Sequence, residues 1–421
     1  MLNRRTFIAS GAALAGLGLA RPALAQGKAI RIGYVSPQTG PLSAFSAADA
    51  FMVRQFLAAA PGLGIKAEVI VKDSQSNPNR AAEVARELIS RDEVNLLLVA
   101  STPETTNPVC SVAESEEIPV ISTVAPWQPW FIGQQGNPAD PNSWQEFDYV
   151  YHFFWGLEDN VRVFMNMWEA VQTNKSVGAL WPNDGDGNAW ASDVGMPPAL
   201  AETGYKLTDP GRYQNLTDDF SAQISAFKQA QAEILVGIPI PPDFTTFWTQ
   251  ARQQGYRPRL VSVAKALLFP ESVAALGELG DNLTAEVWWS PQHPFRSSLT
   301  GQSAGELAGD FEAAAKRQWT QPAGFVHALF EVAVDAIRRT DDPTDADALA
   351  KAIAATDLQT VVGRVAWGQE NVPEFARKNV AKTPLVGGQW RRKQDGGFDL
   401  VIVENALAPE IPLGDTIRTL A

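Results

Sequence analysis

Short, continuous apolar runs alternate along the chain with segments in which apolar residues recur every three or four positions. The run Leu96-Leu97-Leu98-Val99 has no polar break, as expected of a strand in a parallel sheet that is covered on both faces. Asn77-Pro78 precedes apolar residues at 81, 84, 85, 88 and 89, and this spacing predicts a capped helix. The pattern predicts strands at 30–35, 65–71, 96–99 and 119–122, with helices at 47–59, from 77 onward, and at 105–116.

The alternation pauses at 125–148, a stretch rich in Trp and Pro that is predicted to be a loop insertion, and then resumes. The second block predicts helices at 161–171, 193–203, 219–230 and 244–254, with strands at 177–181, 205–207, 234–237 and 260–263. The remaining chain predicts helices at 306–318 and 325–339 and strands at 363–367 and 398–403. Two blocks of alternating strands and helices predict an α/β fold with two lobes.

The first 25 residues have the pattern of an export signal. Arg4-Arg5 precedes an apolar run at 8–19, and Ala23-Leu24-Ala25 offers a cleavage pattern. The paired arginines are typical of a twin-arginine signal, so a periplasmic location is predicted. The apolar run is too short to span a bilayer, and no later stretch without charges is long enough. The mature chain is therefore expected to carry no membrane span.

Composition narrows the classes of function. Acidic residues outnumber Lys and Arg by 47 to 34, which gives a formal charge of −13 and argues against nucleic acid as a partner. The single cysteine, Cys110, excludes an internal disulfide and a multi-cysteine metal site. No nucleophile elbow, phosphate-binding loop or zinc motif occurs in the sequence. We therefore expect a protein that is not an enzyme and needs neither a cofactor nor a metal.

Four motifs, in order along the chain, resemble those of type I periplasmic binding proteins, in the branch of leucine/isoleucine/valine-binding proteins that serve ABC importers. They are IGYVSPQTGPL at 32–42, DSQSNP at 73–78, IPVIS at 118–122 and TDDFSAQI at 217–224. The resemblance covers about 28–403 and implies two Rossmann-like lobes joined by three hinge crossings. We place the crossings near Asp148, Gly280 and Arg364, so that lobe 1 is 28–148 plus 281–363 and lobe 2 is 149–280 plus 364–421.

The resemblance also implies ligand-binding residues in the first lobe. Ser101 and Thr102 follow a buried strand and precede a helix, where the family binds the carboxylate of its ligand. Hydroxyl and free N–H groups at a helix start suit an anion, although simple N-capping is the alternative. The other candidates implied in this lobe are Phe45, which would pack on the ligand, and Thr123, Ala125 and Trp127 beyond the next strand.

Candidates elsewhere are Trp155 and Asp186 in the second lobe, and Trp288, which closes a strand predicted in the first. Asp184, Asp186 and Asn188 match the opening of a calcium loop, but Ala189 and Gly195 occupy its sixth and twelfth positions. An Asp/Gly turn is therefore expected instead of a calcium site.

Lys265 follows the strand at 260–263, where amino-acid-binding members of the family tend to carry an acid. If Lys265 faces the cleft, its positive charge would repel a ligand ammonium and favour acids that lack an amino group. The alternative is that Lys265 is an ordinary lysine exposed to solvent.

The predicted function is that of a periplasmic solute-binding component of an ABC importer, which binds an amino acid or a related small carboxylate between its lobes. The resemblance implies permease subunits in the inner membrane as partners, and a monomer is expected. The alternatives are a binding protein for an acid without an amino group, such as an aromatic acid, and a ligand-sensing partner of a membrane receptor. A secreted hydrolase is disfavoured because no nucleophile constellation is present.

Overall fold

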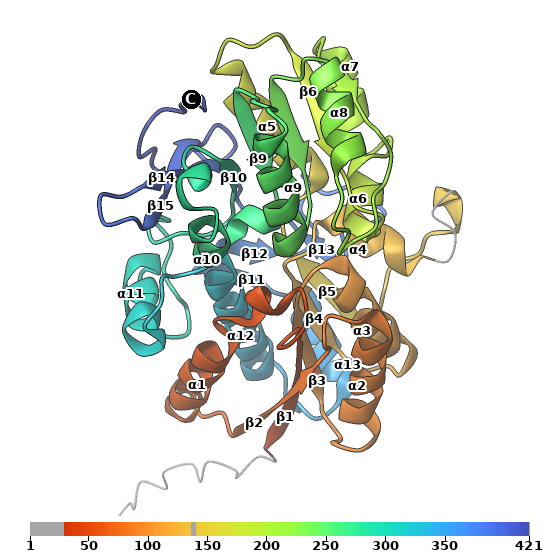
Figure 1. The fold of residues 1–421 in the computed structure, drawn as a ribbon. Coiled ribbons are helices and arrows are strands. Elements are labelled where there is room, and N and C mark those ends of the chain that lie inside the picture. The colour runs from red at the N-terminus through yellow and green to blue at the C-terminus, as the bar shows by residue number, and fades with distance from the viewer. Residues whose placement is uncertain (1–28, 136–139, 421) are drawn as a thin grey trace, which may run out of the picture.

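The computed structural model describes residues 29–135 and 140–420, so the predicted export signal lies outside the described residues. The chain forms two α/β lobes, each built on a central sheet with helices packed against both faces (Figure 1). The first lobe occupies the lower half of Figure 1 and the second lobe the upper half. Within the described ranges, no helix has the length and apolar character needed to cross a bilayer.

The sheet of the first lobe has six parallel strands in the order β13-β5-β4-β3-β1-β2. Their bounds are β1 Ile30–Ser36, β2 Ala67–Asp73, β3 Leu96–Ala100, β4 Val120–Thr123, β5 Val150–Phe153 and β13 Val380–Ala381. Leu96 and Leu98 enter the core on one face, and Leu97 and Val99 enter a separate core on the other. This alternation explains why β3 is apolar throughout.

Two sets of helices cover these faces. The helices α1 (Asp49–Ala59), α11 (Ala304–Ala315) and α12 (Gln321–Arg339) pack together on one side. The helices α2 (Pro78–Ser90), α3 (Pro103–Ser115) and α4 (Trp127–Gln134) form the other layer. The helix α13 (Ala346–Ala354) and the hairpin of β11 (Asp357–Thr360) and β12 (Gly363–Ala366) pack on α12. As predicted, Asn77 caps α2, because its side chain accepts hydrogen bonds from the N–H groups of Asn79 and Arg80.

The second sheet has the order β15-β14-β10-β9-β8-β6-β7, and β14 runs antiparallel to both of its neighbours, β10 and β15. The bounds are β6 Ser176–Leu180, β7 Lys206–Thr208, β8 Ile234–Gly237, β9 Leu260–Val263, β10 Thr284–Val287, β14 Val386–Arg392 and β15 Phe398–Glu404. The helices of this lobe are α5 Leu157–Glu169, α6 Gly185–Trp190, α7 Met196–Glu202, α8 Ser221–Gln229, α9 Pro241–Gln253 and α10 Pro270–Ala274.

The three crossings between the lobes lie further along the chain than expected. The chain leaves the first sheet after β5, leaves the second sheet after β10, and passes from β13 to β14 at 382–385. The expected crossings at Asp148, Gly280 and Arg364 would place β5, β10 and β13 in the wrong lobes. The chain completes a strand before it crosses, and β5 and β13 are too short to stand out as apolar runs.

Two predicted elements differ from the structure. The predicted loop at 125–148 contains the helix α4, whose Trp127, Trp130 and Phe131 are all buried. Because apolar residues fill more than one full turn of α4, at 129–132, no helical period is visible in the sequence. The helix predicted at 193–203 is the shorter α7, and the helix α6 lies before it, in the Asp/Gly segment where a turn was expected.

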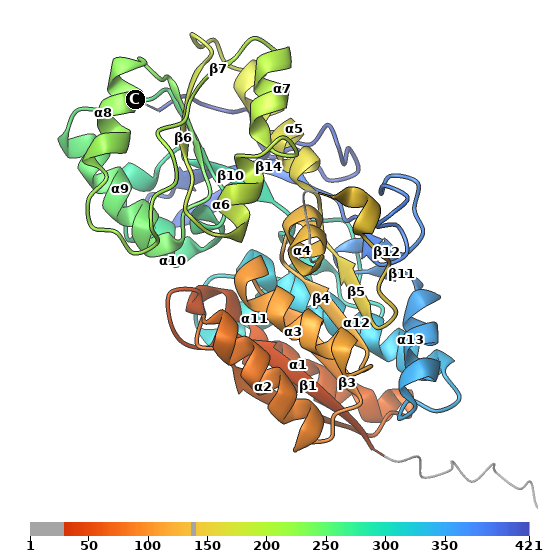
Figure 2. The same ribbon diagram turned by 90° about the vertical axis from the view of Figure 1, so that its right-hand side faces the viewer.

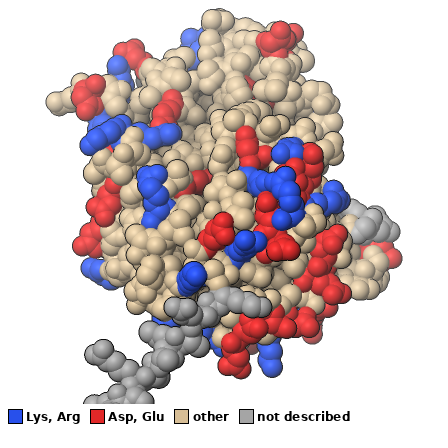
Figure 3. All heavy atoms as spheres, turned by 90° about the horizontal axis from the view of Figure 1, so that it is seen from below, with Lys and Arg blue, Asp and Glu red and all other residues tan. Residues whose placement is uncertain are grey.

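Seen from below the first lobe, acidic and basic side chains lie interspersed over the surface (Figure 3). The face shown therefore presents no field of a single sign to a charged partner.

Candidate functional site

A small cavity lies between the lobes, where strands of both sheets end. Thr102 and Val124 follow β3 and β4 of the first lobe, and Ile238 and Lys265 follow β8 and β9 of the second. The carboxyl edge of a parallel sheet is the usual place for a ligand in this class of fold. The cavity holds about 300 Å³ of empty space, including its opening. It is lined by Phe45, Thr102, Val124, Pro126, Phe154, Trp155, Asp186, Ile238, Lys265, Leu268, Glu286 and Trp288.

Two neighbouring hydroxyl groups at the start of α3 have different environments. The Ser101 hydroxyl accepts a hydrogen bond from the Thr105 hydroxyl at 2.7 Å, and the Ser101 carbonyl accepts one from Thr106. Thr102 lines the cavity, and its buried hydroxyl has no partner within the described residues. Of these two side chains, Thr102 therefore lines the cavity and Ser101 does not.

Lys265 is buried and paired. Its Nζ atom lies 2.7 Å from Oδ2 of Asp186 and 3.5 Å from Oδ2 of Asp184, and the side chain is only 4% exposed. Burial alone would lower the pKa of Lys265, but the charges of Asp184, Asp186 and Glu104 outweigh burial and hold that pKa above its usual value. The ammonium is therefore charged, and the carboxylates of Asp184 and Asp186 neutralise its charge. Lys265 is not a solvated lysine, and it does not present an unopposed positive charge to the cavity.

The backbone at Lys265 is strained. Lys265 has φ 60° and ψ −63°, and the N–H of Ala266 donates to the carbonyl of Ala264 at 2.6 Å. These values describe a γ-turn of the rare kind with positive φ. Such strain persists only where the surroundings enforce it, and it concentrates at functional sites. Here the turn directs Lys265 toward α6 instead of continuing the line of β9.

Two buried carboxyl groups border the cavity, and each has an oxygen without a partner in the described part of the chain. These oxygens are Oδ1 of Asp186 and Oε2 of Glu286. Burial raises the pKa of Asp186 above its usual range, because the pairing with Lys265 only partly offsets it. Burial raises the pKa of Glu286 to about 8, although backbone N–H groups of Glu286 and Lys265 oppose the shift.

Aromatic rings form much of the cavity wall. Phe154 packs on Trp155 with ring centroids 4.7 Å apart and meets the ring edge of Trp288 at 5.0 Å. On the other side, Phe45 packs edge-on against Phe269. The indole N–H groups of Trp155 and Trp288 have no partner in the described chain. The site thus combines apolar rings, three hydrogen-bond donors and two carboxyl groups.

A direct hydrogen bond joins the lobes beside the cavity. Glu104, in the first turn of α3, accepts a hydrogen bond from the N–H of Gly185 at 2.8 Å. Gly185 begins α6 of the second lobe, and Asp184 caps that helix through the N–H of Gly187. In Figure 2, α3 and α4 of the first lobe face α6 of the second, in agreement with the contacts between these helices.

Six of the predicted site residues line this one cavity, and they are Phe45, Thr102, Trp155, Asp186, Lys265 and Trp288. Trp288 reaches it from the end of β10, which belongs to the second sheet and not to the first as expected.

The other predicted residues lie behind the cavity wall. The Thr123 hydroxyl donates to the carbonyl of Phe153 at 2.6 Å, and the Ala125 carbonyl lies 2.7 Å from Nε2 of His152. Trp127 packs against Phe375. All three, like Ser101, are absent from the lining. Their neighbours Val124 and Pro126 line the cavity instead, because alternate residues leaving β4 point to opposite sides.

Glu286 was missed by sequence reasoning. It is the one charged residue in Thr284-Ala-Glu-Val-Trp-Trp289, a segment that is otherwise apolar apart from its first residue. An acid in such a segment is a signal of a functional or paired carboxyl group. Val124, Ile238 and Leu268 carry no comparable signal, since buried apolar residues are common at strand ends.

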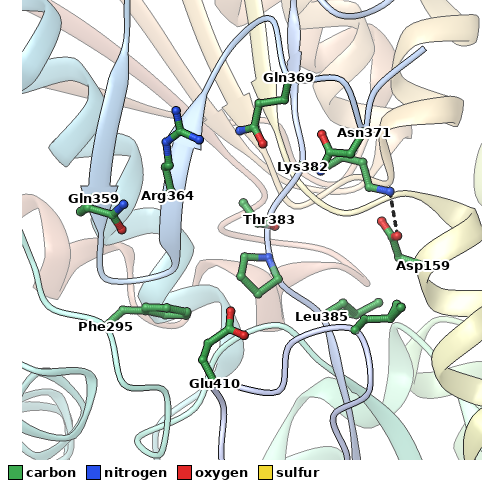
Figure 4. Close-up of a pocket in the computed structure, with 12 residues that line it drawn as sticks. Asp159, Phe295, Gln359, Arg364, Gln369, Asn371, Lys382, Thr383, Leu385 and Glu410 are labelled. Carbon is green, nitrogen blue, oxygen red and sulfur yellow. Dashed lines mark hydrogen bonds and ion pairs between the residues drawn. The ribbon is translucent and has the colours of Figure 1, made fainter.

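A second cavity, of about 1040 Å³ of empty space, lies beside the third crossing (Figure 4). Its cations are already paired within the chain: Lys382 with Asp159 at 2.7 Å and Arg364 with Asp357 at 2.6 Å. The pairing of Lys382 ties the third crossing to the start of α5, which follows the first. We therefore assign this cavity to the hinge region between the lobes and not to the binding of a charged ligand.

The described residues contain no group of three or more His, Cys, Asp or Glu side chains that could hold a metal ion. Of the residues that match a calcium loop, Asp184 caps α6 and Asp186 binds Lys265.

Comparisons with known proteins agree with this architecture. A family described as periplasmic binding protein matches residues 29–383. The leucine binding protein LivK from Thermotoga maritima shares 18% identity, with a TM-score of 0.70 over 90% of this chain and 99% of that chain. A solute binding protein from Rhodopseudomonas palustris BisB5, in complex with 3,4-dihydroxy benzoic acid, shares 15% identity, with a TM-score of 0.71 over 91% and 99%.

The branched-chain amino acid binding protein LivJ from Streptococcus pneumoniae, in complex with isoleucine, shares 16% identity, with a TM-score of 0.67 over 89% of this chain and 100% of that chain. Among curated proteins, none matches this chain. The match over 29–383, together with two α/β lobes that meet at their strand ends, shows that the chain belongs to the type I periplasmic binding proteins.

Proposed function

We propose that this protein is the solute-binding component of an ABC importer and that it encloses one small organic solute between its lobes. One observation carries the proposal: both lobes bring buried polar groups without partners to the same cavity, Thr102 from the first and Asp186 and Glu286 from the second. Polar groups of this kind are costly unless a ligand satisfies them. A ligand that bonds to these groups would therefore stabilise the closed arrangement of the lobes.

The ligand is small and bears hydrogen-bonding groups. The cavity holds about 300 Å³ of empty space including its opening, so only a small solute could be enclosed there, and the lobes would move apart to admit it. Phe154 and Trp288 pack edge-to-face in the cavity wall. Aromatic walls of this kind suit a ligand with an apolar side chain or ring. Amino acids and related solutes therefore remain the first class to test.

An acid without an amino group is now the less favoured ligand. Its carboxylate would rely on Lys265, whose ammonium is already bound to Asp186 at 2.7 Å. The nearby charge of Asp184 would add repulsion. From the sequence, Lys265 was expected to favour acids without an amino group over amino acids. Its pairing with carboxylates in the structure argues for the opposite preference.

The protein acts in the periplasm as a monomer, and its permease partner lies in the inner membrane. Sensing through a membrane receptor is the second candidate function, because it would use the same closed form. A gene for a permease beside the gene for this protein would favour import. Recovery of the bound solute unchanged would exclude a hydrolase.

A thermal-shift panel of amino acids, amines, amides and aromatic acids tests the proposal. A solute at 100 times its Kd adds about 2.7 kcal/mol to the free energy of unfolding, a shift that the assay detects readily. Ile238→Phe, which fills the cavity, should abolish that shift. Leu216→Phe, at an exposed position of the same lobe, is the control and should preserve it. Equal shifts in both variants would place the binding site elsewhere.

A further inference from the structure

Asp186 and Glu286 present two acceptor atoms to the cavity. Oδ1 of Asp186 and Oε2 of Glu286 have no partner within the described chain, and the two residues are 2% and 1% exposed. A carboxyl oxygen buried in this way is stabilised by a donor, above all by a charged one. Both residues line the cavity from the second lobe, and the charge of Asp186 acts on Glu286, so the two carboxyl groups lie near each other.

The charges around these oxygens favour a cation. Lys265 is the one cationic residue of the cavity lining, and its Nζ atom lies 2.7 Å from Asp186. Glu104 and Asp184 add negative charge nearby, since both raise the pKa of Lys265. The side-chain donors without partners that remain for an anionic group are the hydroxyl of Thr102 and indole N–H groups, which are neutral. A carboxylate would thus enter a site whose net charge is negative.

The aromatic walls act in the same direction. Phe45, Phe154, Trp155 and Trp288 all line the cavity. The face of an aromatic ring attracts a cation, and the attraction grows when water is excluded. Rings combined with carboxyl groups are therefore better matched to an organic cation than to an anion.

We infer that the cavity selects its solute by a protonated nitrogen whose N–H groups bind Asp186 and Glu286, so that the substrate class is a small primary or secondary amine and a carboxylate is dispensable. This inference rests on the proposed function, because it names the ligand of the same site. The requirement for N–H groups follows from the two acceptor oxygens, which a quaternary ammonium could not satisfy.

Proton linkage is a consequence. Glu286 is faced by Lys265 after β9, by Asp186 on α6 and by the neutral Asn160 on α5, and burial raises its pKa to about 8. At pH 7 Glu286 therefore holds a proton that must leave before the carboxylate can pair with an ammonium. Amine binding should release protons, and affinity should rise with pH through 8 for an amine with a pKa near 10.

Matched solutes on the unmodified protein test the inference by calorimetry. L-Leucine is compared with 3-methylbutylamine, which lacks the carboxylate, with 4-methylpentanoate, which lacks the amine, and with 4-methylpentanamide, which is neutral. L-Phenylalanine, 2-phenylethylamine and 3-phenylpropanoate form an aromatic series, and short alkyl amines extend the range of size. Amines of fitting size should bind at least as tightly as the matching amino acids, and the acids should not bind.

A variant tests the role of Glu286. Glu286→Gln should weaken amine binding by about 10- to 100-fold, since it removes a hydrogen bond between charged groups. Calorimetry of the amine in phosphate and in Tris at pH 7 should show proton release, and Glu286→Gln should remove it. Glu331→Gln is the matched control, because Glu331 is a buried glutamate that does not line the cavity.

The outcomes separate the two proposals. Binding of amino acids, amides or acids without binding of any amine would overturn the amine assignment and leave the solute-binding function in place. Binding of none of these solutes would count against both. Amine binding that Glu286→Gln leaves unchanged in affinity and in proton release would also overturn the assignment.

Discussion

At the scale of single residues, the adjacent hydroxyls of Ser101 and Thr102 have different roles, one in the fold and the other at the cavity. The Ser101 hydroxyl is engaged by Thr105 at the first turn of α3, whereas the Thr102 hydroxyl is turned to the cavity without a partner. A buried hydroxyl without a partner lowers the stability of the ligand-free protein, but it can add to the affinity for a ligand that bonds to it. A hydroxyl that already has a partner in the chain adds to the stability of the fold instead.

Thr102→Val should therefore weaken binding of the solute that the panel identifies by about 3- to 10-fold, the value of one neutral hydrogen bond. The melting temperature of the ligand-free protein should stay close to that of the wild type. Thr320→Val is the control, because the Thr320 hydroxyl is also buried without a partner but does not line the cavity. Equal affinity of both variants, measured by calorimetry, would remove Thr102 from the site.

The residue types of the cavity were partly predictable, and the pairing of Lys265 was not. Phe45, Thr102 and Trp155 could be placed because strand ends mark the ligand edge of a parallel sheet. The partner of Lys265 is Asp186, which lies 79 positions earlier and comes close because β6, which precedes α6, and β9 both flank β8 in the second sheet. No local pattern encodes a contact of that separation.

At the scale of elements, the first turns of α3 and α6 meet across the cleft. Glu104 of α3 accepts from the N–H of Gly185 at the start of α6, a group that a helix leaves unsatisfied. The carboxylate also complements the positive end of the α6 dipole. This contact forms only when the lobes are closed, so it stabilises the closed form.

Glu104→Ala and Glu104→Gln separate the two contributions of this contact. The alanine variant removes the acceptor and should increase the open fraction of the ligand-free protein, measured as the distance between spin labels on the two lobes. The glutamine variant keeps an acceptor without the charge and should lie between alanine and wild type. Glu202→Ala, on the exposed surface of α7, is the control. Identical distance distributions in all four proteins would show that the contact does not hold the lobes.

Elements with a clear period or a long apolar run were predictable, as β3 and the capped α2 show. Elements whose identity depends on tertiary pairing were not. The strand β13 has two residues and exists because it pairs with β5. The helix α4 buries its first five residues, and it packs on α3 and α6, so its sequence lacks a separate polar face.

At the scale of the whole molecule, three chain segments join two lobes that each have their own sheet. Most of the packing lies within the lobes, and the lobes meet at the cavity and at the α3, α4 and α6 contact. An architecture of this kind closes as a hinge around its ligand.

Saturating solute should therefore reduce the radius of gyration measured by small-angle scattering. The same titration should change tryptophan fluorescence, since Trp155 and Trp288 line the cavity. Trp319→Phe, a change outside the cavity, should leave the fluorescence response intact. An unchanged radius at saturation would contradict closure, even if the fluorescence responded.

The carboxyl groups of the cavity, Asp186 and Glu286, and the paired Lys265 all belong to the second lobe, whereas the first lobe supplies Phe45 and Thr102. The charged half of the site is thus complete before the lobes meet. A charged solute would be captured first by the second lobe, at a rate that depends on ionic strength. The first lobe would then decide how long the solute stays, so capture and retention can evolve separately.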